Sequence, residues 1–166
     1  MPLSLKIIRA AENARKTLEA GVTSVRDAGG TPLGVKMAAE SGLIPAPRMK
    51  LAVSILSQTG GHGDFLLPSG LHFPIGMPVD ICLPEWPNSV CDGPDEVRKA
   101  VRANLRAGAD FIKLCSSGGV LSPSDEPTAT QFTREEISIM VAEAAAEGKT
   151  CMAHAQGTQG IRNAVE

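Results

Sequence analysis

The pattern that most constrains the fold of this chain is a strict alternation of helical and extended segments. Apolar residues recur every three or four positions in five stretches, which predicts helices over residues 6–20, 34–41, 93–108, 133–148 and 160–166. Short β-branched or apolar runs between them predict strands over residues 22–25, 49–56, 110–115 and 150–153. Alternating units of this kind predict an α/β fold with a parallel sheet and right-handed crossovers.

Two closures of such a sheet fit the alternation. A doubly wound open sheet needs four or five strands, which suits a single domain of 166 residues with a sizeable core. A (β/α)8 barrel typically needs about 250 residues. If the chain belongs to a barrel, residues 1–166 therefore supply only about half of it, namely four of its eight strands.

Composition excludes several classes of partner. Sixteen basic and eighteen acidic residues give a net charge of −2, aromatic residues make up 3% and tyrosine is absent, which argues against nucleic-acid binding. We expect no membrane partner, because no apolar run approaches the length of a membrane span. The four cysteines form no Cys-x-x-Cys pair and the start of the chain does not resemble a signal peptide, so we expect a reducing, cytoplasmic location.

Lys113 is the most unusual residue, because it lies within the apolar run of residues 110–115. Buried strands rarely contain a free ammonium group. Side chains alternate along a strand, so Lys113 shares a face with Phe111 and Cys115, and His154 shares a face with Met152 on the last predicted strand. If the two strands are neighbours, Lys113 and His154 point to the same side of the sheet and could hold a metal ion together.

The residues alone leave three interpretations of Lys113 open. Its ammonium group could reach solvent along the side of the sheet, as structural lysines do. As a neutral amine with a pKa lowered by burial, it could form a Schiff base with a carbonyl substrate. The neutral amine could also add CO₂ to form a carbamate, an anionic oxygen ligand able to bridge two metal ions. The sequence does not choose between the last two.

Polar residues follow each predicted strand, and parallel α/β folds place their active sites at the carboxyl ends of the strands. After the second strand comes a Gly-Gly-His-Gly-Asp segment that contains Gly61 and His62. Glycines let the backbone approach a ligand closely, so this segment is a candidate ligand contact. A phosphate cradle is a weaker interpretation, since neither GxGxxG nor GxxxxGK[ST] is present.

Four segments, residues 21–27, 59–64, 108–113 and 153–155, resemble the amidohydrolase superfamily. The similarity is greatest to its imidazolonepropionase-like and Xaa-Pro or Xaa-Arg dipeptidase branch. The resemblance implies a partial TIM barrel containing about strands two to five, with one or two divalent ions, zinc above all. It also implies that Lys113 is carboxylated and bridges the metals, that His154 binds metal, and that His62 and Gly61 lie beside the substrate. Asp27 is expected to act at most through other residues.

The reaction implied by the resemblance is hydrolysis of a C–N bond in a small amide or dipeptide by metal-activated water. The family's His-x-His pair, its strand-six histidine and its strand-eight aspartate have no counterpart in residues 1–166, so we expect a fragment truncated at both ends. Half a barrel exposes two strand edges, which the rest of the barrel or a second copy would cover. The alternatives are a Schiff-base lyase or aldolase using Lys113, and a non-catalytic α/β module.

Overall fold

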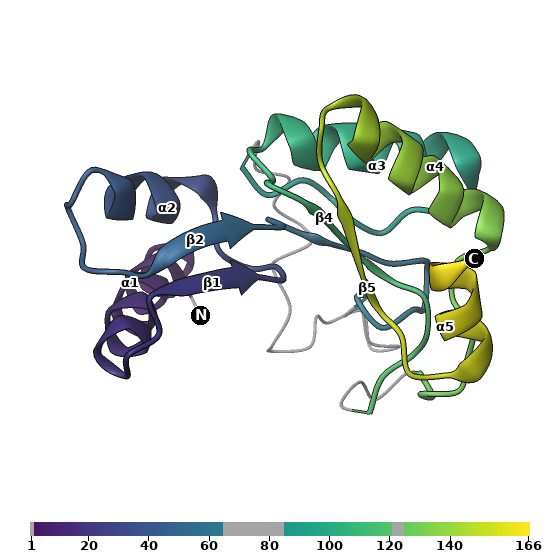
Figure 1. The fold of residues 1–166 in the computed structure, drawn as a ribbon, viewed down its shortest axis with the longest axis horizontal. Helices are drawn as coiled ribbons and strands as arrows, with labels where there is room; N and C mark the ends of the chain where they lie inside the picture. Colours follow the sequence, from purple (N-terminus) through teal and green to yellow (C-terminus); the bar gives the residue numbers. More distant parts are fainter. Residues whose placement is uncertain (1, 65–84, 121–124) are drawn as a thin grey trace.

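The computed structural model describes residues 2–64, 85–120 and 125–166, and its helices and strands alternate as the sequence predicts (Figure 1). The helices are α1 (Leu3–Glu19), α2 (Leu33–Glu40), α3 (Gly93–Arg106), α4 (Arg134–Ala146) and α5 (Thr158–Val165). The strands are β1 (Ser24–Asp27), β2 (Arg48–Leu51), β3 (Ile55–Leu56), β4 (Ile112–Cys115) and β5 (Cys151–His154). None of the helices in these described ranges is both long and apolar enough to cross a membrane.

All strand pairs are parallel, which confirms the predicted α/β class. β1 pairs with β2, and β4 lies between β3 and β5 in a second ladder. Figure 1 shows α1, β1, α2 and β2 at one end of the molecule, and α3, α4 and α5 with the three-stranded ladder at the other. Within the described residues β4 has two partner strands, and each of the other strands has one.

The predicted strand over residues 49–56 is wrong in one respect, because the structure divides it into β2 and β3. The Ser54 amide donates to the Ala52 carbonyl at 2.8 Å, which forms a γ-turn centred on Val53 with φ of 66°. A β-branched residue rarely adopts a positive φ. The turn lets β2 pair with β1 and β3 pair with β4, so one chain segment joins both ladders.

Two polar side chains from distant segments satisfy the backbone groups at this interruption. The Leu51 amide donates to Asp110 Oδ2 at 2.9 Å, and the Asp110 amide donates to the Leu51 carbonyl at 2.7 Å. The Ser54 amide also donates to the buried Asn104 Oδ1 at 3.2 Å. Backbone groups buried without partners are costly, so these contacts stabilise the junction between the two ladders.

Replacing Asp110 with asparagine should lower the free energy of unfolding by about 2 kcal/mol. Lys36 Nζ lies 3.0 and 2.8 Å from the two carboxylate oxygens, and both side chains are mostly buried. Burial acts to raise the pKa of Asp110, but the hydrogen bonds from Lys36 and Leu51 outweigh it and the pKa lies below 3.8. The contribution is therefore complete above pH 3.8 and is lost as the pH falls through the folded-state pKa. Urea unfolding at pH 7 and at pH 3 measures both effects. Asp95→Asn, at a fully exposed carboxylate, is the matched control and should change stability little.

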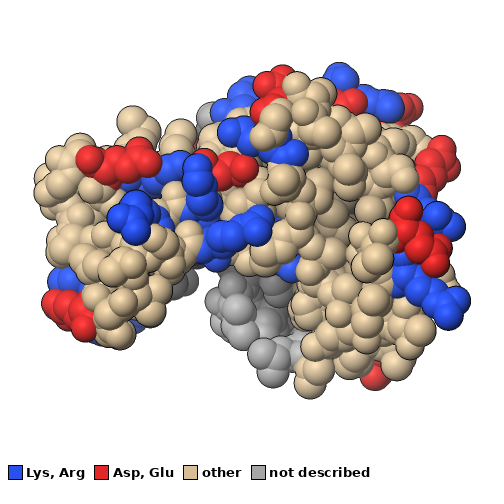
Figure 2. Space-filling model, viewed as in Figure 1, with Lys and Arg blue, Asp and Glu red and all other residues tan. Residues whose placement is uncertain are grey.

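Helices α3 and α4 cover one face of β3–β4–β5 and form the main core there. Ile112 and Leu114 of β4 point into this core, together with Leu56, Val97, Val101, Ile137 and Met140. Figure 2 shows charged side chains over these helices, where Glu143 of α4 accepts hydrogen bonds from Arg98 and Arg102 of α3. Because β4 alternates, Lys113 and Cys115 must point to the opposite face.

Thr133 and Glu136 form the Thr-x-x-Glu pattern that predicts a capping box at the start of α4, and the structure confirms it. Thr133 Oγ1 accepts from the Glu136 amide at 3.2 Å, and Glu136 Oε2 accepts from the Thr133 amide at 2.7 Å. The same carboxylate group reaches α3, because Glu136 Oε1 accepts from the Gly93 amide at 2.8 Å. The cap thereby fixes the start of α4 against the start of α3.

Candidate metal and substrate site

Lys113 lies in the middle of β4 with only 8% of its surface exposed. In the part of the chain that the structure describes, its amine makes no hydrogen bond or ion pair. Burial is the main cause that lowers the pKa of Lys113 below 10.5, and the nearby Cys115 opposes it. The lowered pKa increases the share of neutral amine, which is the form that reacts with carbonyl compounds or CO₂.

His154 ends the neighbouring strand on the same face as Lys113. The register pairs Lys113 with Met152 and Cys115 with His154, and paired residues of parallel strands share a face. The two strands are therefore neighbours, which was the condition for Lys113 and His154 to share one side of the sheet. Burial raises the pKa of the Cys115 thiol to about 12, so at neutral pH it is uncharged beside these two nitrogen-bearing side chains.

A single hydrogen bond determines the tautomer of His154. Its Nε2 lies 3.1 Å from the carbonyl oxygen of Gly118, and because a carbonyl only accepts, Nε2 must carry the proton. Nδ1 of the neutral ring then keeps its lone pair, which is the arrangement of a metal-binding histidine held by an outer partner. Burial and then the proximity of His62 lower the pKa of His154, which favours this neutral ring.

His62 stacks on His154. The ring centroids are 4.3 Å apart and the ring planes make an angle of 22°. His62 comes from the loop after β3 and His154 from the end of β5, so the loop crosses the carboxyl ends of β4 and β5 to reach it. The structure therefore brings His62 and His154 together at the carboxyl ends of the strands, where the sequence predicts the site.

Gly61 must be a glycine for a packing reason. A Cβ at this position would lie 2.6 Å from Ser57 Oγ and 2.7 Å from Gln131 Oε1, closer than real Cβ contacts. Its backbone amide donates to the Gln58 carbonyl at 2.9 Å. These contacts hold the loop that carries His62, and the contact of Gly61 with substrate stays a prediction.

Other polar residues after the strands have structural partners. Asp27 accepts hydrogen bonds from the Gly29 amide at 2.9 Å and from Thr31 Oγ1 at 2.8 Å, so it stabilises its own loop. Ser116 Oγ donates to the His154 carbonyl at 3.0 Å, and Ser117 Oγ accepts from the Gln156 amide at 2.8 Å. The two serines thereby tie the ends of β4 and β5 together.

Sequence reasoning missed two residues that contact His62. Asp125 Oδ2 lies 3.4 Å from His62 Nδ1, and Gln131 Oε1 accepts from the His62 amide at 3.0 Å. Both belong to the segment between β4 and α4, where no periodicity or motif distinguishes them from ordinary polar loop residues. Their role follows only from the folded structure.

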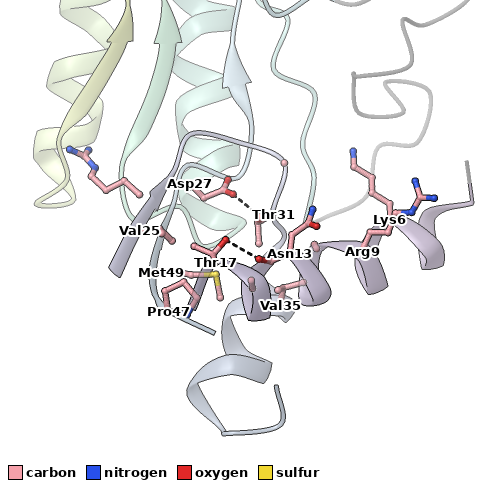
Figure 3. A pocket seen from close by; sticks show the side chains of 14 residues that line it. Lys6, Arg9, Asn13, Thr17, Val25, Asp27, Thr31, Val35, Pro47 and Met49 are labelled. Carbon is pink, nitrogen blue, oxygen red and sulfur yellow. Dashed lines mark hydrogen bonds between the residues drawn. The ribbon is translucent and has the colours of Figure 1, made fainter. Parts of the chain in front are cut away.

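A cavity of about 450 Å³ lies elsewhere, between α1, β1, α2 and β2 (Figure 3). Figure 3 shows the hydrogen bond from Thr31 to Asp27 beside this cavity. Neither Lys113, His62 nor His154 lines it. Figure 2 also shows Lys and Arg side chains gathered over β1 and β2, where the register places Arg26 beside Lys50. Neither feature adjoins the histidine pair.

The donors present suit a divalent metal but do not complete its coordination. His154 offers Nδ1, and Lys113, once carboxylated, would offer oxygen, which are ligand types that zinc accepts. Within residues 2–64, 85–120 and 125–166, no three His, Cys, Asp or Glu side chains gather closely enough to hold an ion. A catalytic zinc has about three protein ligands. Further ligands would therefore have to come from outside the described residues.

Comparison with known proteins identifies the family. The sequence profile of the amidohydrolase family matches residues 2–166. Ochratoxinase of Aspergillus niger is 38% identical over 162 residues, which cover 95% of this chain and 34% of ochratoxinase. A crystal structure of a prolidase complexed with N-methylphosphonate-L-proline superposes with a TM-score of 0.87 at 40% identity, covering 99% of this chain and 40% of the prolidase. A Xaa-Pro dipeptidase structure with bound methionine gives 0.83 at 31% identity, with 99% and 39% covered.

These relatives confirm that the alternating units are part of a TIM barrel rather than an open sheet. The chain spans between 34% and 40% of the length of these relatives. With a family profile that matches almost every residue, the chain belongs to the amidohydrolase family.

Proposed function

We propose that this chain is part of a metal-dependent hydrolase that cleaves the C–N bond of a small amide or dipeptide. The observation that carries the proposal is that His154 shares a face with the buried Lys113, whose amine has no partner among the described residues. The His154 ring presents Nδ1, because Nε2 donates to Gly118. The prolidase, dipeptidase and ochratoxinase relatives support the reaction class. N-acyl amino acids and Xaa-Pro dipeptides are the substrates to test first.

In this proposal each residue has one task. The neutral Lys113 amine attacks the carbon of CO₂ and loses a proton, which leaves a carbamate anion. That carbamate and His154 Nδ1 would hold one or two divalent ions, zinc above all, which when bound would supply the Lewis acidity that activates water. His62 and Gly61 would contact the substrate at the edge of the site. The three described cysteines are free, which accords with the cytoplasmic location that stays a prediction.

Replacing His154 with alanine should weaken zinc binding by at least about tenfold, because the described residues offer few other donors. Zinc uptake by the purified chain in bicarbonate buffer measures this, with Gln156→Ala as the control in the neighbouring loop. Amino-acid release from the candidate substrates is assayed in the same samples and in any longer polypeptide that contains residues 1–166. If neither zinc uptake nor amino-acid release is observed, a non-catalytic module is favoured.

A second candidate follows from the same lowered pKa of Lys113, which would also suit a Schiff base. Borohydride reduction in the presence of a carbonyl substrate would trap Lys113 as a stable secondary amine, detectable by peptide mass. Trapping at Lys113 without any requirement for metal would replace the hydrolase proposal by a lyase or aldolase.

A further inference from the structure

Asp125 is a buried carboxylate that faces the histidine pair from the segment between β4 and α4. Only 3% of its side chain is exposed. Its Oδ2 accepts from the Gly119 amide at 2.8 Å and from Gln131 Nε2 at 3.4 Å, and it lies 3.4 Å from His62 Nδ1. A carboxylate this deeply buried is retained only where partners compensate for the loss of water.

The second oxygen of this carboxylate is unusual. Asp125 Oδ1 is buried and has no hydrogen-bond partner within the described residues. A buried acceptor without a partner destabilises a folded protein. Such a group in a folded protein requires an explanation beyond stability, and the ring of His62 lies 3.4 Å from the other oxygen of the same carboxylate, Oδ2.

Gln131 connects the carboxylate to the backbone of the same histidine. Its Nε2 donates to Asp125 Oδ2, and its Oε1 accepts from the His62 amide at 3.0 Å. Gly119 holds the ring from another side, since a Cβ there would lie 1.9 Å from His62 Cε1. The His62 ring thus contacts Asp125 at Nδ1 and Gly119 along its edge. His154 stacks on its face.

We propose that Asp125 is a positioning residue that keeps the His62 imidazole in its Nδ1–H tautomer and stacked on His154. A carboxylate only accepts, so a neutral His62 ring beside it gains an electrostatic contact when Nδ1 carries the proton. The separation of 3.4 Å is longer than a strong N–H···O bond, and such contacts commonly tighten when substrate binds. The consequence for catalysis rests on the proposed function, whereas the effect on the ring does not.

The test reads the ring directly in the full 166-residue chain. Long-range ¹H–¹⁵N correlation spectra of ¹⁵N-histidine-labelled, metal-free chain report the tautomer of each of its three histidines. His72→Gln removes the signals of the third histidine, so the remaining signals belong to His62 and His154. We expect a predominant Nδ1–H tautomer at His62 in the unmodified chain. Asp125→Ala should convert this signal to a mixture or to Nε2–H, and should also reduce the ring-current shifts caused by stacking on His154.

Asp125→Asn tests the charge alone, because it keeps the side-chain shape and an acceptor for Gly119. We expect a partial loss of the Nδ1–H tautomer, and this variant carries the test if Asp125→Ala does not fold. Glu126→Gln, at an exposed carboxylate in the same segment, is the control and should leave the spectrum unchanged. Unchanged His62 tautomer and shifts in folded Asp125 variants would overturn the proposal.

Activity provides a separate readout. Where hydrolysis is measurable, Asp125→Ala should raise KM at least about fivefold with metal content unchanged, since Asp125 positions His62 and binds no metal. A loss of metal in Asp125→Ala would make Asp125 a ligand instead and would overturn the positioning role. A failure to bind metal, both in the unmodified chain and in any longer polypeptide that contains residues 1–166, would contradict the proposed function while leaving the tautomer measurement interpretable.

Discussion

Replacing Lys113 with methionine should raise the free energy of unfolding by about 1 kcal/mol while abolishing divalent metal binding. Methionine has a similar length and carries no charge, so it suits a position that is 8% exposed and lacks a described partner. A functional group that lowers stability is the expected signature of a residue retained for chemistry. If Lys113 were retained for packing, its replacement would lower the free energy of unfolding instead.

The burial of Lys113 also predicts the direction in which stability changes with pH. Burial lowers the folded-state pKa of Lys113 below 10.5, so between the two values the unfolded chain binds more protons. The stability of the unmodified chain should therefore rise as the pH increases through the folded-state pKa toward 10.5, and Lys113→Met should lack this rise. Urea unfolding over this pH range measures the stability, and metal analysis measures the bound zinc. Lys99→Met, at an exposed lysine of α3, is the control and should leave zinc binding intact. A large loss of stability in Lys113→Met would contradict this account of the lysine.

Replacing Gly160 with alanine should lower the free energy of unfolding by about 3 kcal/mol. Gly160 lies in the first turn of α5, where a Cβ would be 2.5 Å from the Ser116 carbonyl oxygen and 2.9 Å from Ser117 Cβ. Ser116 and Ser117 tie β4 to β5, so helix α5 must move away from the strand ends to admit a methyl group. The displacement should also weaken the alignment of Lys113 with His154.

Gly34 offers a matched control for this change. It too lies in the first turn of a helix, α2, but the nearest atom to its Cβ position is Glu85 Oε2 at 3.8 Å. Alanine there should raise the free energy of unfolding by about 0.5 kcal/mol, because it reduces the entropy of the unfolded chain. Thermal unfolding of both variants separates the two cases. Equal effects at Gly34 and Gly160 would show that helix propensity, and not the contact with Ser116, decides the outcome.

The features that sequence reasoning recovered are those determined by local pattern. Alternation along a strand is a property of each backbone segment, so the inward faces of Lys113 and His154 could be predicted, as could the capping box at Thr133. The adjacency of β4 and β5 was a condition of that prediction, and the register of the two strands meets it. These predictions needed no knowledge of distant contacts.

The features that were missed depend on residues far apart in the chain. The strand is interrupted at Val53, where Asp110 accepts a hydrogen bond from the Leu51 amide and Asn104 accepts one from the Ser54 amide. The sequence of residues 49–56 alone does not indicate those partners. Asp125 and Gln131 reach His62 across more than sixty positions. Gly118 and Gly119 gave a weak signal, since two successive glycines after a buried strand indicate a close approach. Gly119 closely approaches the ring of His62, whereas Gly118 closely approaches Asp125 and Glu126.

The proposed metal site depends most on the carbamate of Lys113, and ¹³C NMR of the chain equilibrated with ¹³C-bicarbonate and zinc tests for this carbamate directly. We predict one carbamate carbon resonance that is absent from Lys113→Met, is lost on acidification and accompanies the bound zinc. Zinc bound by the unmodified chain without any such resonance, or a resonance that persists in Lys113→Met, would contradict the account.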